Sequence, residues 1–146
     1  MSFLRPVSVG QLHLGLAILR VVTGLVFMAH GGQKLFVFGL DGVTGGFAGM
    51  GLPLPGVLGP LVALGELLGG FALVVGLLTR VASFGLAIIM LGAVLIVHAK
   101  NGFFAPEGFE FPLTLLAALL AFTVAGPGAY ALDGVIVSRR STSRTR

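Results

Sequence analysis

Five ionisable side chains interrupt long apolar stretches of this chain, where a charge is costly to place. They are Arg20, His30, Lys34, Glu66 and His98. Ionisable groups within apolar, membrane-length segments usually face the interior of a helix bundle, pair with one another and mark a functional site. We therefore take these five residues as candidates for binding a substrate or a cofactor. Their types and spacing assign a catalytic role to none of them.

Arg20 and Glu66 carry opposite charges and lie in consecutive apolar stretches. If both stretches are upright helices that rise about 1.5 Å per residue, the two residues differ in depth by about 6 Å, within reach of an extended arginine. We therefore expect Arg20 and Glu66 to form an ion pair. Such a pair either fixes the register of two helices or belongs to a substrate or proton site, and both roles stay open.

His30 and His98 are expected at one level near the opposite end of the bundle, with Glu66 below them and Lys34 above. Two imidazoles beside a carboxylate can hydrogen-bond a quinone carbonyl, relay protons or bind a metal, and loop carbonyls can also satisfy them. We assign no metal site, because no third firm ligand accompanies the histidines. Within residues 12–36, four residues with seven-residue spacing form a stripe that should point inward: His13, Arg20, Phe27 and Lys34.

The composition places these residues in a membrane protein. Hydrophobic residues make up 56% of the chain and charged residues 10%, with a mean hydropathy of +1.08. Soluble domains contain about 25% charged residues, so most of the outer surface must meet lipid. The absence of cysteine excludes disulfides and thiolate chemistry. The net charge of +4 forms no basic face that would bind nucleic acid, so the expected partner is the bilayer.

Four apolar stretches are long enough to cross a bilayer, which takes about 20 residues each. They predict an all-α fold, a transmembrane four-helix bundle forming a single domain over residues 1–146. The expected spans are residues 12–36, 56–78, 81–99 and 111–129. The Gly126-Pro127-Gly128 stretch should end the last apolar run, which is the shortest.

Glycine is abundant both within and between these spans. Gly65 and Gly69 form a small-xxx-small pair, and Gly85 and Gly92 lie one heptad apart, so close helix packing accounts for all four. Residues 37–55 contain so much glycine and proline that regular helix should break there. We expect this loop to fold back over the mouth of the bundle. Together with residues 101–110 it would form either a lid or an aromatic collar at the lipid interface, and we favour the collar.

The distribution of lysine and arginine predicts the orientation. Arg5, Arg80 and the basic tail at 138–146 lie on one side of the membrane, whereas Lys34 and Lys100 lie on the other. Because cytoplasmic loops are enriched in basic residues, both termini should be cytoplasmic. The chain is then a multi-pass protein of the plasma membrane of a prokaryote.

Four segments of the sequence carry a resemblance to a known family. They are RVVTGLVFMAHGGQKLF from Arg20, GELLGGFALVVGLLTR from Gly65, HAKNGFF from His98 and GPGAYALD from Gly126. In this order they resemble the DoxX family of small four-span membrane proteins. The resemblance implies a membrane subunit linked to thiosulfate:quinone oxidoreductase or to an oxidative-stress complex. It also implies that the family's polar positions correspond to Arg20, His30, Lys34, Glu66, Arg80 and His98.

Three hypotheses about function follow. The leading one is a membrane component of a quinone-linked redox or sulfur system, such as an oxidoreductase subunit, in which the candidate residues line a pocket for a quinone or a small anion. The second is a non-catalytic scaffold that anchors a soluble redox enzyme at the cytoplasmic face through the basic tail or the Arg80 loop. The third is a small transporter subunit, which would need a tight bundle or a homo-oligomer to enclose a polar path.

Overall fold

The structure is a computed structural model that describes residues 6–136. Within this range three helical stretches are long and apolar enough to cross a membrane, and a fourth apolar helix is shorter. They are Val9–Gly49, Pro55–Val75, Thr79–Asn101 and Glu110–Ala125. The chain is therefore an all-α, roughly four-helix membrane protein, as the sequence predicted. The N-terminal Arg5 and the basic tail at 138–146 lie outside the described residues.

The first helical stretch is longer than expected. Helix α1 (Val9–Gly32) begins at a capping box, in which the Ser8 side chain accepts from the Gln11 amide and the Gln11 side chain accepts from the Ser8 amide. It continues through a π-helical segment, η2 (Gln33–Phe38), into helix α2 (Gly39–Gly49). Gly39, with a φ of 69°, lies at the junction. The irregular loop expected over residues 37–55 is thus wrong for most of its length.

Packing explains why so many glycines remain helical in α2. This helix folds back against α3 (Pro55–Val75), where Val43 is buried and a Cβ added to Gly59 would lie 3.0 Å from Val43 Cγ1. Tertiary contact therefore outweighs the low helix propensity of glycine, which costs about 1 kcal/mol per residue relative to alanine. The expectation that this segment folds back onto the bundle is confirmed.

The remaining helices follow the predicted boundaries closely. Helix α3 ends at Gly76, whose φ of 72° suits a glycine cap. Helix α4 (Thr79–Gly92) continues through the π-helical segment η3 (Ala93–His98) and the short 3₁₀ turn η4 (Ala99–Asn101). Helix α5 (Glu110–Ala125) ends at the predicted glycine–proline stretch, so the fourth span does not reach residue 129 as a helix.

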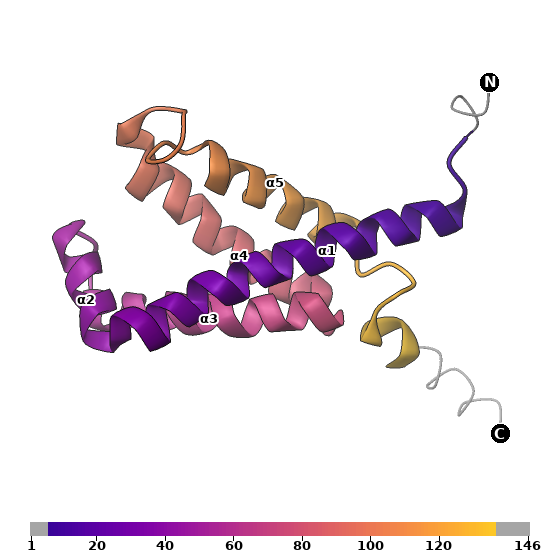
Figure 1. Ribbon diagram of the computed structural model, residues 1–146, viewed down its shortest axis with the longest axis horizontal. Helices are drawn as coiled ribbons and strands as arrows, with labels where there is room; N and C mark the ends of the chain where they lie inside the picture. The colour runs from indigo at the N-terminus through magenta and orange to yellow at the C-terminus, as the bar shows by residue number, and fades with distance from the viewer. Residues whose placement is uncertain (1–5, 137–146) are drawn as a thin grey trace.

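The helices form two pairs, with α1 along α3 and α4 along α5 (Figure 1). The pairs lie close together near the end of the molecule that holds both ends of the described chain. They diverge toward the other end, where α2 and the loop after η4 are found (Figure 1). We call these the terminal end and the distal end. An even number of crossings accounts for both chain ends lying together.

Glycines set the close contact between α1 and α3. A Cβ added to Gly24 would lie 2.7 Å from the Gly70 carbonyl oxygen, and one added to Gly31 would lie 2.8 Å from the carbonyl oxygen of Ala63. Because backbone meets backbone at both points, these contacts fix how far the two helices can slide along one another.

The predicted packing glycines divide into two groups. Gly65 and Gly69 face α4, where added Cβ atoms would lie 3.1 Å from Ile89 and 3.0 Å from Leu86. Gly85 and Gly92 have no neighbour within 4 Å of an added Cβ, so close packing does not explain them.

The centre of the bundle is small and its outside is apolar. Phe27, Leu73, Leu86 and Leu119 belong to the buried cluster. The inward stripe on the first span is confirmed, because Arg20 is buried with Phe27 while His13 and Lys34 are half-buried. Large apolar side chains are exposed on every long helix, as a lipid-facing surface requires: Ile18, Leu25, Leu64, Leu68, Ile88, Leu95, Leu120 and Val124.

Candidate functional site

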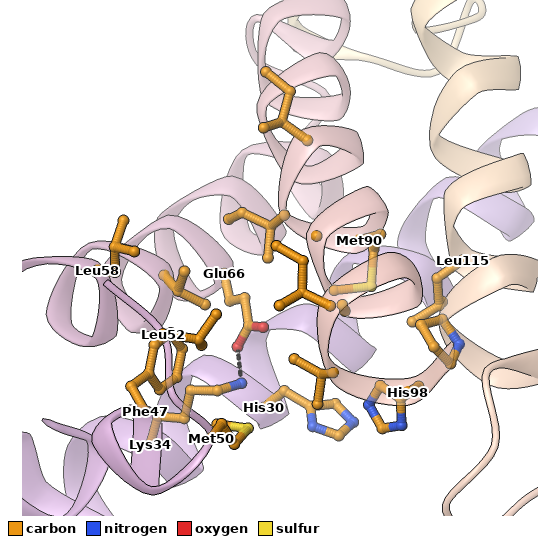
Figure 2. A pocket seen from close by; sticks show the side chains of 18 of the residues that line it. His30, Lys34, Phe47, Met50, Leu52, Leu58, Glu66, Met90, His98 and Leu115 are labelled. Atoms are coloured by element: carbon orange, nitrogen blue, oxygen red, sulfur yellow. Dashed lines mark hydrogen bonds and ion pairs between the residues drawn. The ribbon is translucent and has the colours of Figure 1, made fainter. Parts of the chain in front are cut away.

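A cavity of about 560 Å³ lies at the distal end. Its walls come from α1, η2, the α2 region and α3, and from α4, η3 and α5 (Figure 2). The lining is almost entirely apolar and includes Phe27, Met90 and Leu115. Its polar side chains are four of the five residues singled out from the sequence: His30, Lys34, Glu66 and His98.

Glu66 and Lys34 form an ion pair within this lining. The Lys34 ammonium donates to Glu66 Oε2, and the two side chains point toward one another in Figure 2. The Glu66 side chain is 4% exposed, whereas that of Lys34 is 22% exposed. A carboxylate so deeply placed needs a counter-charge, and Lys34 provides it from a different helix. Glu66 Oε1 has no hydrogen bond within the described part of the chain.

His98 is oriented by the loop that follows it. Its Nδ1 lies 2.7 Å from the Glu107 carbonyl oxygen, which also accepts from Asn101 Nδ2 at 3.2 Å. Because a carbonyl can only accept, Nδ1 must carry the proton in this contact. Satisfaction by a loop carbonyl, one of the alternatives raised by the sequence, therefore holds for this nitrogen of His98. The other nitrogen, Nε2, makes no hydrogen bond among the described residues.

His30 lies against Phe111 of α5, with 6.1 Å between the ring centroids. It makes no hydrogen bond within residues 6–136. Figure 2 shows His30 and His98 at the same margin of the cavity, as expected from their predicted level in the membrane. Across residues 6–136, no group of three or more His, Cys, Asp or Glu side chains is placed to hold a metal ion.

The distal loops contribute differently to the cavity. Phe47, Met50 and Leu52 line it, so the α2 region covers the cavity as a lid would. Phe103 instead makes edge-to-face contacts with Phe104 and Phe109, with centroids 5.3 Å apart in each case. Both Phe103 and Phe104 are exposed. The first loop therefore fits the lid. For the second loop, of which Pro106 and Gly108 also line the cavity, the aromatic collar at the lipid interface stays a prediction.

One feature of the site was missed from the sequence, and another, the lid, was raised but set aside in favour of the collar. The cavity residues Lys34 and His98 both lie in π-helical segments, η2 and η3. Such segments are uncommon and occur often at functional sites. The apolar residues Phe47 and Met50 in a glycine-rich segment were the available signal for the lid.

Arg20 lies outside this site, and the expected Arg20–Glu66 ion pair is not what the structure shows. The contact of Gly24 with Gly70 and of Gly31 with Ala63 sets the register of α1 against α3. This register places Arg20 beside Gly76 and Glu66 nearer to His30. Ten residues then separate the levels of the two charges, roughly 15 Å along a helix. The assumption that both spans start at the same membrane edge caused the error.

Arg20 instead holds the terminal end together. It is 2% exposed, and its Nη2 donates to the Tyr130 carbonyl oxygen. Nearby, Asp133 accepts from the backbone amides of Leu78 and Thr79 at 2.7 and 2.9 Å and so caps α4. Asp133 thus caps a neighbouring helix rather than the segment that carries it. These contacts tie the segment after α5 to the other helices.

Comparison with known proteins identifies relatives of the chain. The family model described as DoxX matches residues 15–99. "Putative oxidoreductase CatD" of Bacillus subtilis is 34% identical over 120 residues, which cover 82% of this chain and 85% of that protein. An uncharacterized membrane protein of Mycobacterium tuberculosis is 32% identical over 136 residues, covering 86% and 82%. "Inner membrane protein YqjF" of Escherichia coli is 32% identical over 127 residues, covering 84% and 92%. No solved structure matches.

Proposed function

The chain belongs to the DoxX family of membrane proteins, and from this premise we propose that it is a component of a quinone-linked redox system. Its distal cavity binds the quinone headgroup. The Bacillus subtilis relative is named as an oxidoreductase, which supports a redox role for this chain.

The observation that carries this proposal is the chemistry of the cavity lining. Small-molecule sites are mostly apolar concavities of about 300–1,000 Å³ with a few convergent polar groups. A cavity of about 560 Å³ with two imidazoles and an ion pair fits that description. A quinone ring and its isoprenoid tail suit the apolar walls. The ring oxygens suit the polar margin, where Lys34 and His30 provide donors.

We place the protein in the cytoplasmic (inner) membrane with both termini in the cytoplasm. The Escherichia coli relative is named as an inner membrane protein, which supports the location. Arg80 is exposed at the terminal end, whereas Lys34 and Lys100 lie at the distal end. Arg5 and the basic tail at 138–146 lie outside the described residues but adjoin their two ends in sequence, and counting them gives the terminal side the excess of basic residues. Such an excess favours the cytoplasmic side. The cavity then opens toward the outer leaflet.

Binding to the purified protein tests the cavity. Titration of decylubiquinone into the detergent-solubilised protein should give saturable binding. His30→Ala should weaken it by about tenfold, because a donor to a ring oxygen worth roughly 1–1.5 kcal/mol is lost. Glu66→Gln should weaken it to a similar degree, because the carboxylate that holds the donor Lys34 in the cavity lining is lost. Lys100→Gln is the matched control, since Lys100 is exposed at the same end and does not line the cavity. Unchanged affinity in both cavity variants would remove the site from consideration.

A further inference from the structure

The cavity presents two hydrogen-bond acceptors that the protein leaves open. The contact of His98 Nδ1 with the Glu107 carbonyl places the proton on Nδ1, so Nε2 of the neutral ring carries a free lone pair. Glu66 uses Oε2 for Lys34, and its Oε1 is the second acceptor. Both side chains line the cavity. No described residue donates to either atom, so both can accept from a molecule bound in the cavity.

These two acceptors distinguish the two redox forms of a quinone. The oxidised form carries carbonyl oxygens, which only accept, and it leaves both protein acceptors unpaired. The reduced form carries hydroxyl groups, which donate and also accept. A hydroxyl can therefore donate to His98 or Glu66 while it accepts from Lys34. The Glu66 side chain is 4% exposed and His98 is half-buried, so a ring bound in the cavity would shield both acceptors from water. An acceptor shielded without a donor is costly, and only the reduced form supplies the donor.

We infer that the cavity selects a hydroquinone over the corresponding quinone, with His98 as the specificity-determining residue. The inference rests on the proposed function, since it names the redox state of the ligand for the same cavity. The loop after η4 sets this specificity, because the Glu107 carbonyl fixes which nitrogen of His98 accepts. The step is binding alone, so no electron or covalent bond is transferred.

Anaerobic calorimetry with decylubiquinol and decylubiquinone measures the preference directly. We expect the reduced form to bind about tenfold more tightly, from one additional satisfied acceptor. A tenfold preference raises the reduction potential of the bound two-electron couple by about 30 mV. His98→Leu should lower the ratio of the two affinities several-fold, with Glu66 Oε1 as the remaining acceptor. Asn101→Ala is the control, since Asn101 contacts the same carbonyl without lining the cavity, and it should keep the preference.

The outcomes separate this inference from the function on which it rests. Failure of both ligands to bind overturns the proposed function and this inference with it. Equal affinity, or tighter binding of the oxidised form, overturns the selectivity and leaves quinone binding intact. An undiminished preference in a folded His98→Leu protein overturns the role of His98.

Nitrogen NMR tests the inference on the unsubstituted protein, so it does not depend on whether a variant folds. In protein labelled with ¹⁵N-histidine, one ring should show a protonated Nδ1 and an unprotonated Nε2, and its Nε2 resonance should shift when decylubiquinol is added. Decylubiquinone should leave that resonance nearly unchanged. Observation of the opposite tautomer at His98 would remove the acceptor and contradict the inference.

Discussion

Two deeply buried ionisable residues, Arg20 and Glu66, occupy opposite ends of the same helix pair and have contrasting surroundings. Arg20 lies against Gly76 and the segment around Tyr130, where the space is filled. Glu66 lies beside a cavity of about 560 Å³. Each residue leaves polar atoms without a hydrogen bond among the described residues, namely Nε and Nη1 of Arg20 and Oε1 of Glu66. Both are costly to bury, yet only Glu66 has room for a ligand beside it. A buried charge alone therefore does not identify a binding site. A cavity beside the charge is what distinguishes a ligand site from a structural contact.

The largest effect on stability is expected from a substitution at Gly76, where the terminal end is most closely packed. In Gly76→Ala the new Cβ would overlap Arg20 Nη1 and lie 2.5 Å from Ala131 Cβ, at a residue whose φ is 72°. We expect a loss of about 3 kcal/mol in the free energy of unfolding, combining backbone strain with overpacking. Equilibrium unfolding in mixed micelles measures it. Gly85→Ala is the control, since it meets nothing within 4 Å and should be nearly neutral. Equal stability of the two variants would contradict the close packing around Arg20.

The next experiment measures both stability and quinone affinity for Arg20→Met and for Glu66→Gln. Arg20→Met should cost about 2 kcal/mol of stability through loss of a charge-assisted hydrogen bond to the Tyr130 carbonyl. Quinone affinity of the folded protein should stay within about twofold, because Arg20 is not among the residues that line the cavity. Glu66→Gln should show the reverse pattern, with its main loss in affinity. Both quantities can be measured on the same preparations. A large affinity loss in Arg20→Met would remove the division between the two ends.

A smaller effect is expected at the cap of α4. Asp133 accepts from two backbone amides through its two carboxylate oxygens, whereas asparagine offers a single acceptor oxygen. Asp133→Asn should therefore lower the free energy of unfolding by about 1 kcal/mol. Hydrogen exchange at the amides of Leu78 and Thr79 should accelerate. If exchange there stayed unchanged, the carboxylate would not be the cap.

The sequence predicted the helices well because each depends on local composition and length. It also grouped His30, Lys34, Glu66 and His98 correctly at one end of the bundle, since their positions along the spans are informative. It failed on the partner of Arg20. The register of two helices is set by backbone contacts such as Gly24 with Gly70, and depth arithmetic from assumed membrane edges does not include them.

The prediction of an irregular loop over residues 37–55 was wrong for a related reason. Glycine and proline counts describe a preference of the isolated chain, whereas packing against α3 decides the outcome in the folded protein. The orientation of His98 was equally inaccessible, because its Glu107 partner belongs to a loop whose path has no sequence signature.

The π-helical segments change which face of the helix the following residues occupy. An α-helix turns about 100° per residue, and a π-helical turn contains one residue more than an α-helical turn. The residues after η2 and η3 are therefore rotated relative to the faces that precede them. The seven-residue stripe from His13 to Lys34 ends where η2 begins its altered turn. Deleting one residue from η2 would restore an α-helical phase and turn α2 about its axis, which would carry Phe47 away from the cavity it lines.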